Sequence, residues 1–347
     1  MKSPSDSRLS RNEFLRLTTG ILAGLGIPGV ITTKASAKAE PLSADYLAHG
    51  LTAMARAQTW FDAHWGAGVL AGYYLCRDHP LDAATVAGIQ REMNAVMEVR
   101  AEQFSPMKEG PVVANRLAEV TDALRPAMRG GLRAHGHAVI FASLATRALR
   151  DAPQMARAEI IEPLCGISRQ IAKLKPQRPA ADAKGYTDTQ TMIETAFDNL
   201  VRFQPLLGHP EIRRPNFTHM ITHTEALMNL EQMGFADLAR EGHLGHRVHL
   251  SAAVPVVPQK ASNTAHQVAL ERVMNGSFWS DAVNTQHWNA RWNPSTNPNG
   301  DWIASGHLFK VLYSHHRLLG RIADAEKAKL ATAILLERYT DPSVQGG

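Results

Sequence analysis

From residue 44 onward, apolar positions recur at intervals of three and four residues, the spacing that gathers them on one face of an α-helix. The same windows are rich in Ala, Leu, Met, Arg, Glu and Gln, which are strong helix formers. No stretch alternates apolar and polar residues over the length of a strand, and no hairpin dipeptide joins two such stretches. The pattern predicts helices over residues 44–77, 82–104, 113–127, 134–150, 153–173, 188–205, 216–232, 235–248, 262–275, 302–319 and 322–338.

The interruptions between these helices are short. Pro80 and Asp82 are a stop signal and a candidate cap between the first two helices. Residues 172–188 are typical of a linker, and residues 289–302 form a polar loop rich in Pro, Gly and Asn. Neither is long enough to require a second domain. We therefore expect one all-α domain over residues 40–347, built of antiparallel helix hairpins packed as a bundle or an α/α toroid.

Residues 1–39 follow a different pattern, which predicts a signal peptide. A polar, basic start leads into the apolar stretch "LTTGILAGLGIPGVI", which is too short and too rich in Gly for a stable membrane span. Small-residue cleavage sites, "ASA" and "AKA", follow it. The segment "SRNEFLR" resembles a twin-arginine signal but has Asn12 where the second arginine should stand. We expect an exported, periplasmic protein that uses the export machinery and is not an integral membrane protein after processing.

Charge and cysteine content narrow the partners. The net charge is +5, and five cations and two acids before Ala37 account for +3 of it. The remainder carries no run of basic residues, so we expect no nucleic-acid partner. The two cysteines, Cys76 and Cys165, are too few for a disulfide framework, and either one bridge or two free thiols would be consistent with the sequence.

Histidine is the abundant chemical group, with sixteen in the chain, all after residue 48. Four predicted helices begin with a histidine and continue with small and apolar residues on most faces, which is typical of buried helices. These histidines are His64, His137, His219 and His307. Helix bundles build metal sites from one inward ligand on each helix, although a lone histidine on an apolar helix is more often a hydrogen-bonded core residue.

Lys310 follows His307 by one turn of an otherwise apolar helix, "GHLFKVLYSHH". The lysine could extend its amine to the surface beside a surface histidine. Alternatively it is buried, where a charged amine is costly unless paired. Neutral imidazoles suit iron, copper, zinc or nickel, so the four histidines and Lys310 are the candidate metal ligands.

Other histidines compete with this set. His223 lies one turn after His219 and could also bind, and His135 is close enough to replace His137. His315 falls near the stripe of His307; together with His223 it is a candidate catalytic residue. His243, His246 and His249 have a spacing compatible with zinc, but the interspersed glycines favour a surface position or a role behind the ligands. The tryptophans that flank the polar loop could line an aromatic pocket or simply fasten that loop: Trp279, Trp288, Trp292 and Trp302.

The four histidine segments together resemble the questin oxidase-like family. The resemblance rests on a histidine before a small-residue helix, "HAVI" at His137, "HMIT" at His219 followed by "EAL", and a late histidine with lysine three residues on, over roughly residues 60–325. It implies oxidative ring opening of aromatic polyketides, described either as Baeyer–Villiger monooxygenation or as non-haem iron dioxygenation. In the iron-dependent members four histidines and a carboxylated lysine hold the metal, which corresponds to His64, His137, His219, His307 and Lys310 here.

Three functions are compatible with these patterns. The favoured one is an exported non-haem iron oxygenase that uses O2 to oxidise or open a small phenolic or quinone ring. The second is a metal-independent Baeyer–Villiger-type monooxygenase in which histidines act as general bases, with NADPH as a candidate co-substrate. The third is a periplasmic helical protein that binds a metal or ligand without catalysis.

Overall fold

In the computed structural model, the described residues are 39–108, 110–209, 212, 214–257, 269–281 and 303–340; in the last two helices, side chains are described from His307 to Glu337. They belong to the second of two compact units, Lys38–Gly347. The predicted signal peptide, Trp288, Trp292 and Trp302 lie outside them. The described part contains helices and no strand, which confirms the all-α fold.

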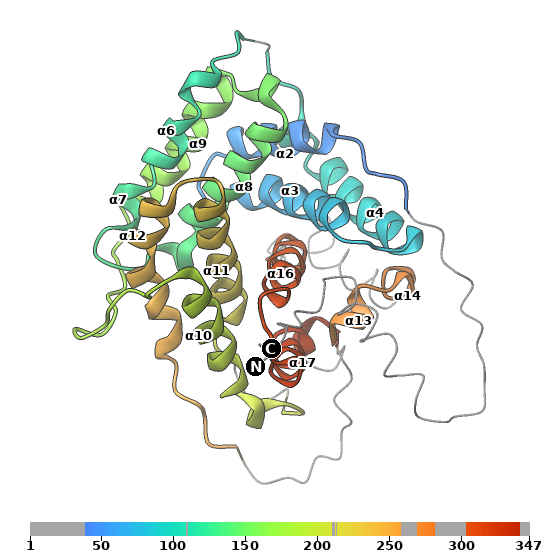
Figure 1. The fold of residues 1–347 in the computed structure, drawn as a ribbon. Coiled ribbons are helices and arrows are strands. Elements are labelled where there is room, and N and C mark those ends of the chain that lie inside the picture. The colour runs from blue at the N-terminus through green and yellow to red at the C-terminus, as the bar shows by residue number, and fades with distance from the viewer. Residues whose placement is uncertain are drawn as a thin grey trace, which may run out of the picture. The chain divides into compact units, whose positions relative to one another are not determined.

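The chain forms a succession of helices joined by short turns (Figure 1). Their bounds are α2 Asp45–Ala55, α3 Ala63–Asp78, α4 Ala83–Val99, α5 Ala101–Phe104, α6 Ala118–Asp122, α7 Arg125–Met128, α8 His137–Asp151, α9 Ala158–Ala172, α10 Thr189–Val201, α11 Phe217–Gln232, α12 Ala236–Arg247, α13 Ala269–Val273, α14 Gly276–Ser280, α16 Ile303–Leu319 and α17 Ala325–Thr340. Short 3-10 turns lie at Ala114–Arg116, Ala134–Gly136, Pro153–Met155, Gln204–Leu206 and Val248–Ser251.

Four of these helices contact one another in cyclic order: α3 packs on α8, α8 on α11, α11 on α16, and α16 on α3. Figure 1 shows them gathered side by side, with α12 on the far side of α11 and α2 against α3. Their buried positions lie on nearly every face, as the apolar sequence pattern predicts for interior helices. The N-terminal ends of these four helices carry the histidines singled out above.

The predicted helix over 44–77 is wrong in one respect, because it breaks into α2 and α3. The hydroxyl and backbone N–H of Thr59 both donate to the carboxylate of Asp62, at 2.8 and 2.9 Å. Such local side-chain bonds offer the backbone an alternative to helix. After the turn, α3 returns closely along α2: a side chain at Gly66 would collide with the backbone of Gly50. The break places His64 at the start of a helix.

Two other predicted helices are also shorter than expected. Residues 82–104 divide at Arg100 into α4 and α5, and residues 113–127 divide into a 3-10 turn, α6 and α7. The expected linker over 172–188 connects α9 to α10. Cys76 and Cys165 are free thiols.

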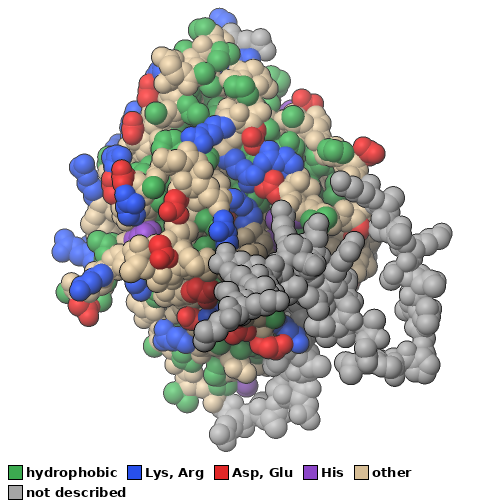
Figure 2. Space-filling model, viewed as in Figure 1, with side chains coloured by type: hydrophobic (Ala, Val, Ile, Leu, Met, Phe, Trp, Pro, Cys, Tyr) green, Lys and Arg blue, Asp and Glu red, His purple; other side chains and the backbone are tan. Residues whose placement is uncertain are grey.

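No helix of the described residues combines the length and the apolar character needed to cross a membrane. On the face shown in Figure 2, basic and acidic side chains lie among one another between apolar and neutral ones.

Candidate metal centre

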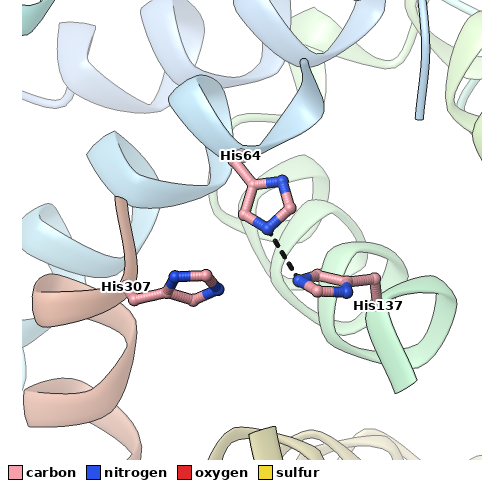
Figure 3. Close-up of side chains that lie close together, drawn as sticks. All are labelled: His64, His137 and His307. Carbon is pink, nitrogen blue, oxygen red and sulfur yellow. Dashed lines mark hydrogen bonds between the residues drawn. The ribbon is translucent and has the colours of Figure 1, made fainter. Parts of the chain in front are cut away.

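Four buried histidines meet where the N-terminal ends of α3, α8, α11 and α16 come together. His64, His137, His219 and His307 are between 0 and 8% exposed. His64 and His307 point toward each other and toward His137 in the close-up (Figure 3). One imidazole nitrogen from each of these three residues lies within 4.8 Å of those of the other two. The fold therefore brings together side chains separated by more than 240 residues of sequence.

The Nε2 atoms form a close chain. Those of His64 and His137 are 2.7 Å apart, the contact dashed in Figure 3. The Nε2 atom of His219 lies 3.2 Å from that of His137 and 3.2 Å from that of His307. Nitrogen ligands bind a first-row metal at about 2.0–2.1 Å, so two neighbouring ligands at right angles are separated by roughly 2.9 Å. The observed separations bracket this value.

The opposite ring nitrogen fixes the tautomer of three of these histidines. Nδ1 of His64 donates to the carbonyl oxygen of Phe61 at 2.6 Å, and Nδ1 of His137 donates to that of Ala134 at 2.5 Å. Nδ1 of His219 lies 2.5 Å from the side-chain oxygen of Asn216. An amide oxygen only accepts hydrogen bonds, so each Nδ1 carries the proton and each Nε2 presents a lone pair. Such outer hydrogen bonds are typical of metal-binding histidines.

Protonation does not relieve the facing lone pairs. A proton between the Nε2 atoms of His64 and His137 would make one ring an imidazolium. Burial, and then the charge of Lys310, hold the pKa of both rings well below the usual 6.5. Burial and the neighbouring His137 do the same for the pKa of His219. A bound cation satisfies these lone pairs where a proton does not, so the donor set fits a metal ion.

Asn216 holds His219 by two contacts at the start of α11. Its side-chain oxygen caps the helix by accepting from the backbone N–H of His219 at 3.4 Å and also accepts from the ring Nδ1. One amide therefore both caps the start of α11 and orients the imidazole of His219.

A left-handed turn before α8 orients the imidazole of His137 in a similar way. Ala134, His135 and Gly136 have φ values of 43°, 54° and 88°. Non-glycine residues rarely occupy this region, and each costs on the order of 1–3 kcal/mol. The turn directs the carbonyl of Ala134 to His137 and places the ring of His135 5.0 Å from that of His219. Backbone strain is thus concentrated beside the histidine cluster.

Lys310 is buried among the same residues and does not reach the surface. It is 1% exposed, and its Nζ has no hydrogen-bond partner within the described part of the chain. Nζ lies 5.3 Å from the ring centre of Phe141, which in turn packs 5.0 Å from the ring of His64 and 5.1 Å from that of His137. Burial lowers the pKa of this amine well below its usual 10.5. The cluster therefore contains a buried amine whose Nζ has no described hydrogen-bond partner and whose charged form is disfavoured by burial.

His223, predicted as catalytic, lies one turn from His219 but contacts a second group of histidines. Its Nδ1 is 3.2 Å from Nε2 of His249. Its Nε2 has no hydrogen-bond partner among the described residues, and the ring borders a narrow pocket formed by α7, α8 and α12. Burial lowers its pKa to about 3.

His315, the other predicted catalytic residue, has different surroundings from the cluster. Its Nε2 is 2.8 Å from the hydroxyl of Thr332 on α17, and its ring stacks at 5.5 Å on Phe197 of α10. Burial lowers its pKa to about 3. These contacts are those of a core histidine, and no described contact joins His315 to the four clustered histidines.

The two histidines of α12, His243 and His246, are buried, so the expected surface position is wrong for both. His243 and His246 are 3 and 0% exposed because α12 packs on α11. His246 bonds to the hydroxyls of Tyr186 and Thr224 at 2.8 and 2.7 Å. With both ring nitrogens paired to hydroxyl groups, His246 is satisfied without a metal.

Two aromatic residues that the sequence patterns did not single out border the cluster. Trp60 and Phe61 lie in the turn before α3, and their rings contact those of His64 and His137. Trp279, for which a pocket lining and a fastener of the polar loop were both open, is 3% exposed and stacks on Phe309 in the core. An aromatic pair directly before "DAH" was the available sequence signal.

The site therefore rests on its own geometry. No protein-family model matches the chain, and neither a curated protein nor a solved structure is significantly similar to it.

Proposed function

We propose that His64, His137, His219, His307 and Lys310 hold one non-haem iron ion. The observation that supports this most strongly is the convergence of unprotonated Nε2 atoms in a buried site whose Nδ1 atoms are already committed to oxygen acceptors. A stable protein does not normally bury lone pairs against one another, because buried polar groups left unpaired are costly. A cation at this point makes the arrangement favourable.

Lys310 enters the ligand set as a carbamate. Its neutral amine attacks CO2, forming an N–C bond and releasing one proton to solvent. The product is an anion that presents oxygen to a metal, and it replaces an unpaired buried amine with a paired charge. The absence of a hydrogen-bond partner for Nζ among the described residues supports this assignment.

The proposed activity is oxidation or ring opening of a phenolic or quinone substrate with O2. When bound, the iron would activate O2 and polarise the substrate. The protein supplies four buried imidazoles, three of them oriented through Nδ1, and the carbamate of Lys310 would add an anionic oxygen. His223, the catalytic residue expected from the sequence, is a poor proton acceptor here, because burial lowers its pKa to about 3 and its ring borders the pocket of α7, α8 and α12. Export through the segment 1–39 is part of the same proposal and would deliver a folded, metal-loaded protein.

Oxygen consumption tests this function. Protein produced with iron and bicarbonate is mixed with a hydroxylated naphthoquinone in an oxygen electrode, before and after exhaustive chelation. We expect substrate-dependent uptake that chelation abolishes and iron restores. Uptake that survives chelation would instead indicate the metal-independent monooxygenase, and binding without uptake would indicate a non-catalytic metal-binding protein.

A further inference from the structure

The four clustered histidines are closed off from water, although a metal ion has to reach them from water. They are between 0 and 8% exposed, and the rings of Trp60 and Phe141 lie directly against those of His64 and His137. A metal site in the core requires an entry path, along which the ion exchanges its water ligands for side chains of the protein. An accessible imidazole beside the cluster would begin that exchange at the surface.

His135 is an exposed histidine in this position, in the 3-10 turn Ala134–Gly136 before α8. Its ring is centred 5.0 Å from that of His219, and the planes of the two rings are 30° apart. Nε2 of His219 in turn lies 3.2 Å from Nε2 of His137 and 3.2 Å from Nε2 of His307. One ring therefore separates the exposed imidazole of His135 from the buried chain of Nε2 atoms.

The backbone of His135 is strained in the conformation that brings its ring there. His135 has φ 54° and ψ 24°, and Ala134 before it has φ 43°. Glycine adopts this left-handed conformation without steric cost. The next residue is a glycine for a steric reason, because a side chain at Gly136 would come within 2.8 Å of the ring of His223. Position 135 has room for a side chain and carries an imidazole that contacts His219. Strained residues of this kind concentrate at functional sites.

His135 is not one of the final metal ligands. None of the close contacts between ring nitrogens that the described residues form within the cluster involves it. The three described histidines that each bring a nitrogen within 4.8 Å of the other two are His64, His137 and His307. The position of His135, exposed on one side and against His219 on the other, is that of a residue between water and the cluster.

We propose that His135 is the entry ligand of the cluster: its imidazole takes a divalent first-row cation from water and passes it to His219 by ligand exchange. A metal–nitrogen bond forms at His219 as the bond to His135 breaks, and no electron is transferred. Imidazole binds iron, copper, zinc and nickel alike, so this step selects the class of cation and not one metal. The inference rests on the proposed metal centre, but it concerns the rate of loading and not the chemistry of the loaded protein.

Stopped-flow mixing of chelated protein with excess Co²⁺ tests the entry ligand, with the visible absorption of bound Co²⁺ as the signal. Mixing the Co²⁺-loaded protein with a chelator measures release. A ligand used only in transit lowers the barrier in both directions. His135→Asn, which keeps a residue that tolerates the left-handed conformation, should therefore slow loading and release alike, by about tenfold or about 1.4 kcal/mol in each barrier. The Kd, which is the ratio of the two rates, should stay within about twofold of wild type.

His135→Gly should slow both rates as well, and its Tm should not fall, because glycine adopts the left-handed turn freely. His49→Asn is the matched control, since His49 is a partly exposed histidine of α2 without a contact to the cluster among the described residues. This control should load and release Co²⁺ at wild-type rates. Circular dichroism of each chelated protein verifies the fold.

Equal rates in wild type, His135→Asn and His135→Gly would overturn the entry ligand and leave the metal centre intact. A raised Kd with an unchanged loading rate would also overturn it, because His135 would then be a permanent ligand. Wild-type protein that binds no Co²⁺ would reject the metal centre itself, and the entry ligand with it.

Discussion

The Nε2 atoms of His64 and His137 lie 2.7 Å apart, although the Nδ1 atom of each ring donates to a backbone carbonyl three residues earlier. Two neutral rings in this state offer two lone pairs and no proton between them. The relationship recurs at His219, whose Nδ1 is committed to Asn216. A single metal ion bound by the three Nε2 atoms would explain the orientation of all three rings. The predictions below follow from this proposal.

Metal removal should destabilise the protein. Because the ion binds only the folded chain, a ligand at one hundred times its Kd adds about 2.7 kcal/mol to the free energy of unfolding. For a domain of about 300 residues, that amounts to a rise in Tm of roughly 4 °C. Thermal scans with and without iron, after chelation, measure the difference. A Tm that is insensitive to iron, copper and zinc would argue against a bound ion.

Asn216→Ala should lower metal affinity beyond its effect on the helix. Loss of a cap costs about 1 kcal/mol, and loss of the outer hydrogen bond to a histidine ligand typically weakens metal binding 10–100-fold. Asp188→Ala is the matched control, since Asp188 caps α10 by accepting from the backbone N–H of Thr191 at 2.7 Å. Competition with a chelator of known affinity measures the metal affinity of both variants. Equal metal affinities would limit Asn216 to capping.

Lys310→Met should abolish the dependence of metal loading on CO2. Methionine fills a similar volume without an amine, so the fold should persist and the apo protein should be no less stable. Wild-type protein labelled with ¹³CO2 should give one carbamate resonance that the variant lacks. Lys327→Met is the control, because the partly exposed amine of Lys327 lies between the carboxylates of Glu194 and Asp198, away from the cluster. Retention of the carbamate resonance in Lys310→Met, or its loss in the control, would contradict the assignment.

His315 should make the fold sensitive to acid. Burial lowers its folded pKa from 6.5 to about 3, so the neutral form is favoured in the folded state. Its contribution to stability is present above pH 6.5 and is lost progressively as the pH falls toward 3, because the unfolded chain binds the proton first. When the pH is lowered from 7 to 5, the free energy of unfolding of wild type should therefore fall by about 2 kcal/mol more than that of His315→Gln. Urea unfolding at both pH values measures this, and identical losses would show that His315 does not titrate as its burial requires.

The sequence was sufficient for the helical fold, because apolar periodicity is a local property, and the recurrence of a histidine before a small-residue apolar stretch marked His64, His137, His219 and His307 as candidates to converge. It also marked Lys310, because a lysine on an apolar helix face must either extend its amine to the surface or find a partner in the interior. The partners of these residues were not predictable. The contacts of Phe61 and Ala134 use backbone carbonyls, which carry no residue signature, and the left-handed turn at His135 has no glycine at its first two positions.

The surroundings of several side chains depend on packing between helices that are distant in sequence, so they could not be predicted from the sequence. The break between α2 and α3 depends on a side-chain bond of Thr59 that competes with the helix pattern. His246 is buried only because α12 lies against α11, and Trp279 is a core residue because Gly88 leaves room for its ring. His315 shares a helix with His307 yet contacts α10 and α17.

Metal analysis of the purified chain is the most direct test of the central claim. Protein made with iron and bicarbonate available should contain one iron per chain, and X-ray absorption should show a first shell of nitrogen and oxygen near 2.0–2.2 Å with no sulfur. His137→Gln, which removes the nitrogen that contacts both His64 and His219, should lose that iron while His315→Gln retains it. A wild-type chain without a stoichiometric transition metal, or a His137→Gln variant that keeps a full complement, would contradict the account.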